Sequence, residues 1–364
     1  MRLAGMAGVR CGLVTTTPRI GLVLGAGGVI GHAYHAGVLD GLCDATGWDP
    51  RDAEVIVGTS AGSVVGALLR AGFSARDLAA RSTGDPVSRE GAELAARAGM
   101  GDGPARFPTG PTRRRGLPRM ASPSLLMRAA LRPFWMNRPG VMLAGALPAG
   151  AVPTDLVAAA FRPLFGSDWP ERNLWLTAVR LRDGNRVVFG RPGAPPAPVA
   201  DAVAASCAIP SFFEPVTVGG VAFVDGGAHS PTNADLLVDY RSPSQAPAPA
   251  TPVGKPAGSA DRELDLVIVS SPMSVAGNRL RPSLDLPARR LCRFYLGQEA
   301  ARIRRRGVPV FAFQPTGDDL KMMGMNAMDP TRRAQVTRQA RESALRKLER
   351  DDARSVLGAL SALR

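Results

Sequence analysis

Residues 54–65 read Glu-Val-Ile-Val-Gly-Thr-Ser-Ala-Gly-Ser-Val-Val, and this stretch decides the fold. An apolar run, which predicts a buried strand, ends at Val57. Immediately after it, residues 58–62 form the pattern G-x-S-x-G, which is typical of a sharp strand-to-helix turn. The apolar residues of the expected helix follow at helical spacing, at Val64, Val65, Leu68 and Leu69. Such a turn lifts a serine hydroxyl away from the sheet, so Ser60 is a candidate nucleophile.

The same strand-and-helix unit occurs once before this stretch. Residues 19–24 form a continuous apolar strand, residues 25–31 a glycine-rich loop, and residues 32–46 a helical pattern. Strand, helix, strand and helix in this order predict a parallel sheet with right-handed crossovers. The chain is therefore expected to have an α/β fold.

The glycine loop, Gly25-Ala-Gly-Gly-Val-Ile-Gly31, predicts an anion site, because consecutive glycines let backbone N–H groups converge. The anion is either a dinucleotide pyrophosphate or the oxyanion of an acyl-transfer intermediate. The dinucleotide spacing G-x-G-x-x-G fails at Ile30, and the second strand ends in the serine turn instead of a ribose-binding acidic residue. The sequence therefore favours the oxyanion hole and keeps nucleotide binding as the alternative.

The remaining pattern predicts further elements along the chain. Helices are expected at 154–165 and 287–306, strands at 174–179, 186–189, 264–269 and 308–313, a hairpin at 216–223 that turns at Gly219-Gly220, and a charged helical region at 331–363.

These elements suggest one catalytic domain with additions. Residues 1–18 are expected to be a flexible leader, 19–240 the catalytic domain, and 264–364 the strands and helices that complete it. The Pro- and Ala-rich residues 241–263 predict a disordered loop. Residues 84–150 form an excursion, read either as helices packed on the core or as a lid or membrane-touching segment.

A third signal, Asp225-Gly-Gly227, follows the hairpin. An aspartate at a strand end can take the Ser60 proton directly, although alone this tripeptide is usually a turn. Glycine loop, G-x-S-x-G and D-G-G in this order resemble the patatin-like phospholipases of bacterial type. Two further segments carry the resemblance, which covers about residues 19–240: Ala205-Ser-Cys-Ala-Ile-Pro-Ser-Phe-Phe-Glu-Pro-Val216 and Asp225-Gly-Gly-Ala-His-Ser-Pro-Thr-Asn233.

The resemblance implies a three-layer α/β/α sandwich with a mainly parallel central sheet and a Ser–Asp dyad. In that dyad Ser60 attacks the ester carbonyl and Asp225 accepts its proton. The implied oxyanion-hole residues are Gly25, Gly27 and Gly28, and the glycines that support the motifs are Gly31, Gly58, Gly62, Gly226 and Gly227. No cofactor and no metal is implied.

The expected activity is that of a serine acyl hydrolase, a lipid acyl hydrolase or phospholipase A-like enzyme. A small-molecule esterase, thioesterase or acyltransferase on the same dyad is the alternative, and a non-catalytic lipid- or nucleotide-binding protein is an alternative of another class. Many family members carry Lys or Arg where this chain has Ile30, which favours a neutral ester or thioester.

The histidines are expected to play lesser parts. His32 and His35, at the start of a helix, are interpreted as packing or capping residues. His229 follows Asp225 by only four positions, whereas a triad histidine normally comes from a distant loop, so a triad is disfavoured.

Composition narrows the partners. The formal net charge is +14, carried almost wholly by arginine, which is compatible with an anionic membrane surface. Aromatic residues make up only 5%, so nucleic acid is not an expected partner.

The sequence contains no run of about 18 apolar residues, so it predicts no membrane-spanning helix. The four cysteines, Cys11, Cys43, Cys207 and Cys292, form no CxxC pair. A cytoplasmic protein with optional peripheral membrane contact is expected; the sequence does not determine its oligomeric state.

Overall fold

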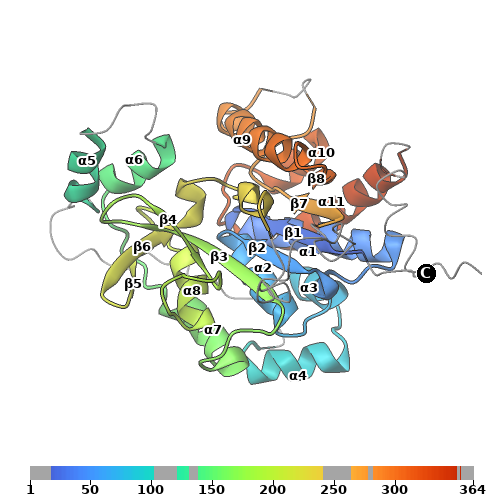
Figure 1. Ribbon diagram of the computed structural model, residues 1–364. Helices are drawn as coiled ribbons and strands as arrows, with labels where there is room; N and C mark the ends of the chain where they lie inside the picture. Colours follow the sequence, from blue (N-terminus) through green and yellow to red (C-terminus); the bar gives the residue numbers. More distant parts are fainter. Residues whose placement is uncertain are drawn as a thin grey trace, which may run out of the picture.

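A computed structural model describes residues 18–101, 121–130, 138–240, 264–277, 282–350 and 353. One mixed, mainly parallel sheet runs through it in the order β5-β6-β3-β2-β1-β7-β8, with β4 paired to β3 (Figure 1). The strands are β1 (Ile20–Leu24), β2 (Val55–Gly58), β3 (Asn173–Arg180), β4 (Arg186–Phe189), β5 (Val216–Val218), β6 (Val221–Asp225), β7 (Leu266–Ser270) and β8 (Val310–Phe313).

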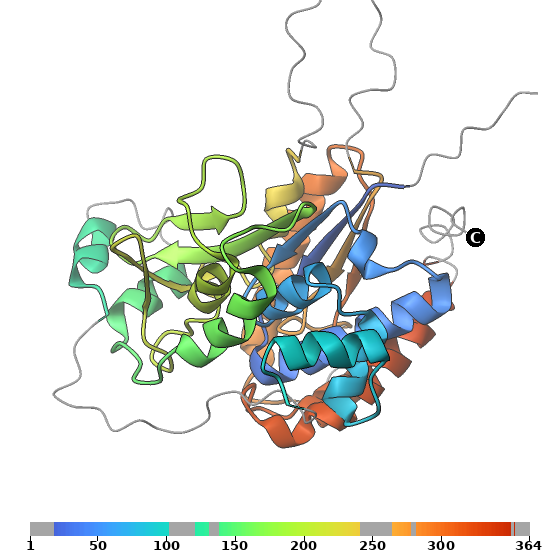
Figure 2. The same ribbon diagram turned by 90° about the horizontal axis from the view of Figure 1, so that it is seen from below.

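Helices cover both faces of the sheet, so the predicted three-layer α/β/α fold is confirmed. On one face lie α1 (Gly28–Thr46), α2 (Ala61–Arg70), α3 (Ala75–Thr83), α4 (Arg89–Arg97), α7 (Asp155–Phe165), α8 (Val199–Ser206) and α11 (Arg333–Leu348). The opposite face carries α9 (Leu286–Arg304) and the short 3-10 helix η4 (Ala234–Leu237). Figure 2 shows the first layer from outside, with α9 behind the sheet.

The remaining helices are shorter or lie at the margins of the sheet. They are α5 (Pro123–Ala130), α6 (Pro139–Ala146), α10 (Gly317–Met323) and the 3-10 turns η1 (Pro50–Asp52), η3 (Gly226–Ala228) and η6 (Pro330–Arg332). No helix in the described ranges combines the length and the apolar character needed to cross a membrane.

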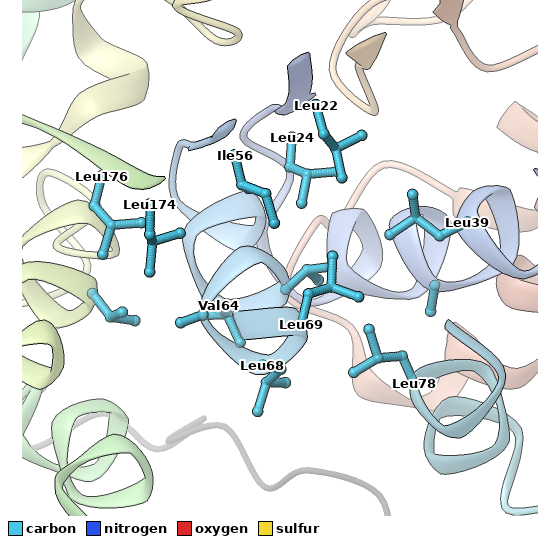
Figure 3. Packing of buried hydrophobic residues seen from close by; sticks show 14 of the residues in the cluster. Leu22, Leu24, Leu39, Ile56, Val64, Leu68, Leu69, Leu78, Leu174 and Leu176 are labelled. Carbon is cyan, nitrogen blue, oxygen red and sulfur yellow. The ribbon is translucent and has the colours of Figure 1, made fainter. Parts of the chain in front are cut away.

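Helix α2 is the centre of the larger core. Its predicted inner-face residues Val64, Val65, Leu68 and Leu69 are all buried. They pack between the side chains of the neighbouring strands and those of α1 and α3 (Figure 3). Burying one such leucine stabilises the fold by about 2 kcal/mol. This packing fixes the helix that begins directly after Ser60.

Strand β3 brings two strand ends together. Leu176 pairs with Gly58 of β2 and also with Phe189 of β4, so β2 and β4 lie on opposite edges of β3. Ala178 pairs with Asp225 of β6 and with Val187 of β4, so β6 also lies opposite β4. Strands β2 and β6 therefore pair with successive stretches of the same edge of β3, β2 with residues 173–176 and β6 with residues 178–180, although each is a direct neighbour of β3 in the strand order. Because they run in opposite directions, their carboxyl ends face each other at Thr177.

The excursion at 84–150 is helical where it is described. Helices α5 and α6 pack on the carboxyl-terminal parts of β3 and β6 through a small apolar cluster of Leu125, Val141, Ala144, Val179, Leu181 and Val224. Pro139 stands in the first turn of α6, where a missing N–H breaks no helical hydrogen bond. Residues 102–120 and 131–137 lie outside the described ranges, as do the expected leader up to residue 17 and the expected loop at 241–263.

Several boundaries differ from the sequence prediction. Helix α1 begins at Gly28 and not at His32, which leaves only residues 25–27 as the glycine loop. The hairpin at Gly219-Gly220 is confirmed, and both glycines have the positive φ of its tight turn. Helix α11 covers Arg333–Leu348 of the last expected helical region, Ala353 is again helical, and residues 354–363 lie outside the described ranges. Helices α3, α8 and α10 were not predicted.

Candidate active site

Ser60 lies on the sharp turn between β2 and α2. Its φ of 54° and ψ of −120° are unusual for a residue with a side chain, and such a conformation costs about 1–3 kcal/mol. The flanking glycines allow the turn, because a Cβ on Gly62 would lie 1.9 Å from the Leu24 carbonyl oxygen. A Cβ on Gly58 would lie 2.7 Å from Ser63 Cα. The G-x-S-x-G spacing is thus a requirement of close backbone packing.

Hydrogen bonds hold this strained turn in place. The Ser60 N–H donates to Ser206 Oγ at 3.0 Å. The Ser60 carbonyl accepts from Ser63 Oγ at 2.6 Å and from Cys207 Sγ at 3.4 Å. The end of α8 therefore supports the turn, so the segment around Cys207 contributes to the site through its side chains.

Asp225 ends β6 and faces Ser60 across Thr177. Its carboxyl group is buried, and burial raises its pKa to about 6 although hydrogen bonds from the Ser60 hydroxyl and the Gly227 N–H act in the opposite direction. The Gly227 N–H donates to Asp225 Oδ1 at 2.7 Å. A carboxylate with a pKa near neutrality is suited to take and return a proton.

The glycines after Asp225 meet steric limits of their own. A Cβ on Gly226 would lie 2.3 Å from Thr177 Oγ1, so a side chain there would push β6 away from β3. At Gly227 a Cβ would contact Asp225 Oδ1 at 3.0 Å and Ala26 Cβ at 3.2 Å. The D-G-G motif therefore lets the backbone after the carboxylate lie close to both β3 and the glycine loop.

The backbone donors of the glycine loop are only partly available. Gly25 N–H donates to the Ser270 carbonyl at 2.9 Å and Ala26 N–H to the Pro231 carbonyl at 2.7 Å. Within the described ranges, the N–H groups of Gly27 and Gly28 have no hydrogen-bond partner. The loop can thus offer an oxyanion these two donors, whereas the expected contribution of Gly25 is not available because its N–H is already engaged.

Two contacts from distant segments shape the same loop. Ala327 accepts from the Ile30 N–H at 3.0 Å and packs against Gly28, whose φ is 61°. His35 lies within α1 and is fully buried. Its Nε2 is 2.8 Å from the Gly25 carbonyl oxygen and its Nδ1 is 2.8 Å from Ser270 Oγ. A carbonyl only accepts, so Nε2 carries the proton and Nδ1 accepts from the serine.

His35 is therefore more than the packing or capping residue that the sequence suggested, because it anchors the loop that precedes Gly27. Burial lowers its pKa to about 4, so the ring is neutral at physiological pH. His32 is also buried, and its pKa falls to about 3 for the same main reason. Ile30 is buried in the main core and presents no polar group to the site.

Asn233 connects the parts of the site and was not singled out from the sequence. Its Nδ2 donates to the Ser230 carbonyl at 2.6 Å and to Thr59 Oγ1 at 3.1 Å, and its Oδ1 accepts from Arg186 Nη1 at 3.0 Å. It joins the loop after Asp225 to the residue before Ser60. Its backbone has a φ of 53°, which asparagine tolerates better than most residues do. Only its position at the end of the family-like segment 225–233 could have pointed to a role for Asn233 from the sequence.

His229 points to a different set of partners. Its Nδ1 lies 3.3 Å from Asn233 Oδ1, and burial together with the charges of Arg186 and Arg138 lowers its pKa to about 4. Within the described ranges, no hydrogen bond joins His229 to Ser60 or Asp225. The geometry thus gives no support to a triad. Nor do three or more His, Cys, Asp or Glu side chains converge as a metal site in the described part of the chain.

Comparisons with known proteins place the chain in a family. The model of the family described as patatin-like phospholipase matches residues 22–238. Among solved structures, VipD from Legionella pneumophila is similar at 10% identity and a TM-score of 0.38, over 92% of this chain and 67% of VipD. The type III effector protein ExoU is similar at 14% identity and a TM-score of 0.31, over 92% of this chain and 53% of ExoU, so this chain spans about half the length of ExoU.

No curated protein matches the chain. The family match covers more than half of the 364 residues and includes the Ser60 turn, the glycine loop and Asp225. The chain therefore belongs to the patatin-like phospholipase family.

Proposed function

We propose that this protein is a lipid acyl hydrolase that cleaves carboxylic esters with a Ser60–Asp225 dyad. Family membership supports lipid acyl hydrolysis as the activity. The observation that carries the dyad is the meeting of two strand ends along β3, which sets the Ser60 hydroxyl beside the buried Asp225 carboxyl. Two unengaged N–H groups, of Gly27 and Gly28, lie in the neighbouring loop.

In the proposed reaction, Ser60 Oγ attacks the ester carbonyl while its proton moves to Asp225. The carbonyl oxygen becomes an oxyanion that accepts hydrogen bonds from the N–H groups of Gly27 and Gly28. Collapse of the tetrahedral intermediate breaks the ester bond, and the leaving alkoxide takes the proton from Asp225. Water then attacks the acyl-enzyme, Asp225 again accepts a proton, and that proton returns to Ser60 as the acid leaves.

The start of α2 supports this assignment electrostatically. The helix begins at Ala61, directly after the nucleophile, so the partial positive charge of its N-terminus acts close to the reacting carbonyl. No basic side chain is present at the Ile30 position to attract a phosphate. A small-molecule esterase or acyltransferase on the same dyad is therefore the second candidate.

A substrate panel tests the proposal. Phospholipids, neutral glycerides and p-nitrophenyl esters would be offered to the wild type and to Ser60→Ala, Asp225→Asn and His229→Ala. We expect Ser60→Ala and Asp225→Asn to lose turnover by at least about a thousandfold, while His229→Ala keeps most of it. Full activity in Ser60→Ala would refute the hydrolase, and a collapse of activity in His229→Ala alone would replace the dyad with a triad.

Covalent labelling separates the enzyme from the non-catalytic readings. A fluorophosphonate probe should label the wild type on Ser60 and leave Ser60→Ala unlabelled. A folded wild-type protein that takes no label and turns over no ester would instead favour a lipid- or nucleotide-binding protein. The relative rates at which the panel substrates are hydrolysed then show whether the enzyme prefers phospholipids or neutral esters.

A further inference from the structure

Helix α9 exposes large apolar side chains to solvent. Phe294 is 58% exposed and Leu291 47%, and Leu284, just before the helix, is 88% exposed. Leu291 and Phe294 are three residues apart and lie on the same side of the helix. Apolar side chains gathered in this way on a surface commonly mark a site of contact with another apolar body.

Arginine side chains accompany these apolar groups. Arg290 and Arg293 line a shallow groove of about 630 Å³ together with Phe294, Gly297 and Ala301. Arg290 forms no ion pair with any residue in the described ranges. Gly297 adds to the groove, because nothing lies within 4 Å of where its Cβ would be. Leu284, Arg290, Leu291, Arg293 and Phe294 are termed the α9 surface below.

The buried side of α9 is joined to the loop after Asp225. Glu299 accepts hydrogen bonds from Ser230 Oγ at 2.5 Å, Thr232 Oγ1 at 2.6 Å and the Ala234 N–H at 2.9 Å. All three donors belong to the segment that follows the proposed base. A rigid helix thus connects the α9 surface to the candidate active site.

A second contact joins α9 to the start of α6 and to the same loop after Asp225. The Arg138 guanidinium, next to α6, lies 5.7 Å from the centre of the Tyr295 ring, and it donates to the His229 carbonyl at 3.3 Å. In Figure 1, α6 and α9 both lie above the strands of the sheet. The helix that carries the α9 surface is therefore held against the loop that follows Asp225 by two separate contacts, through Glu299 and through Tyr295.

We propose that the α9 surface binds an anionic lipid bilayer and holds the active site at it. This inference rests on the proposed lipid acyl hydrolase function. Leucine and phenylalanine side chains can enter the boundary between headgroups and acyl chains, and arginine guanidinium groups bind lipid phosphates while their aliphatic stems remain among the chains. The net charge of +14 attracts the protein to an anionic surface. If the α9 surface bound another protein instead, binding to vesicles would not depend on the charge of their lipids.

Vesicle sedimentation tests the proposal in the Ser60→Ala background, in which lipid is not consumed. Vesicles of phosphatidylcholine alone are compared with vesicles that also contain phosphatidylserine. We expect binding to the anionic vesicles that weakens at high salt. Leu291→Asp combined with Phe294→Asp should raise the lipid concentration for half-maximal binding at least about tenfold. Arg290→Gln should raise it about fivefold.

The chain supplies a matched control in Leu156 of α7. Leu156 is 65% exposed but lies on the opposite face of the sheet from α9. Leu156→Asp adds one such negative charge at an exposed leucine and should bind vesicles as its parent does. Equal binding by the Leu291→Asp/Phe294→Asp protein, an equal loss in Leu156→Asp, or binding that ignores phosphatidylserine would each overturn the proposal.

A soluble ester separates this inference from the proposed function. With Ser60 present, the α9-surface variants should hydrolyse monomeric p-nitrophenyl butyrate at the wild-type rate, which also shows that they fold. If the wild type hydrolyses the soluble ester but the protein with an intact α9 surface does not bind vesicles, the α9 proposal is overturned and the hydrolase stays intact. Vesicle binding without Ser60-dependent hydrolysis would overturn the proposed function and leave the α9 surface as a lipid-binding site.

Discussion

Replacing Asp225 with asparagine should abolish hydrolysis and at the same time make the folded protein more stable at neutral pH. Burial raises the pKa of this carboxyl from 3.8 to about 6, which means that the folded state disfavours its ionised form. A shift of about two units corresponds to about 3 kcal/mol. Asparagine has nearly the same shape, carries no charge, and its Oδ1 can still accept from the Gly227 N–H. We therefore expect a gain of at most about 3 kcal/mol in the free energy of unfolding.

The gain should depend on pH in a defined direction. Above about pH 6 the wild-type carboxyl is ionised in both the folded and the unfolded states, so the full cost of the buried charge is present. As the pH falls from about 6 to about 4, the folded state takes up a proton before the unfolded state does, and the wild type gains stability. The difference between the Asp225→Asn variant and the wild type should therefore be largest at pH 7–8 and shrink toward zero near pH 4.

Urea unfolding at a series of pH values measures this difference, with turnover of a soluble ester in parallel. Asp239→Asn is the matched control, because Asp239 is an exposed carboxylate on the surface and its substitution should change the unfolding free energy by less than about 1 kcal/mol. The reasoning fails if Asp225→Asn is no more stable than the wild type at pH 8. It also fails if the difference stays constant down to pH 4.

Three further predictions concern the same site. Hydrolysis of a soluble ester should fall about tenfold per pH unit below about pH 6, since only ionised Asp225 accepts the Ser60 proton; a rate that stays constant to pH 4.5 would exclude this base. Gly62→Ala should lower the free energy of unfolding by about 3 kcal/mol or more, because its Cβ would lie 1.9 Å from the Leu24 carbonyl oxygen. Thermal melting compares it with Gly297→Ala, whose Cβ would meet open space, and equal melting temperatures of the two variants would contradict the prediction. Asn233→Ala should lower kcat about tenfold or more with little change in KM, because Thr59, directly before Ser60, loses its hydrogen bond to the Asn233 amide. An unchanged kcat would show that the Ser60 turn keeps its conformation without this bond.

The sequence predicted the central part of the fold because the signals there are local. A buried strand, two glycines around a serine and an apolar helical face lie within residues 54–69, and the two glycines are explained by contacts inside that unit or with the adjacent strand β1. The glycine loop was less well predicted. Its length was overestimated because helix α1 begins at Gly28, where the N-terminal turn is completed by the Ala327 carbonyl from a distant segment. No local pattern in residues 25–31 contains that partner.

The connecting residues of the site could not be inferred for the same reason. His35 was assigned to packing or capping since it lies on a helix, yet its two ring nitrogens bind Gly25, directly after β1, and Ser270 at the end of the neighbouring strand β7. Asn233 binds partners that come from three other parts of the chain. Such side chains carry no periodic signal, because their role depends on which strands are neighbours in the sheet. The whole strand order has to be known before they can be recognised.

That strand order also gives a physical reason to expect a dyad without histidine. In a triad, the histidine bridges a gap between nucleophile and acid and must itself be oriented by a third group. Here the proposed nucleophile follows the end of β2 and the proposed base ends β6, and both strands are hydrogen-bonded to the same edge of β3, with Thr177 between their ends. Their separation is then fixed by backbone pairing, and Gly227 orients the carboxylate. A substitution at Thr177 should consequently disturb turnover more than one at His229, although Thr177 has no part in the proton transfer.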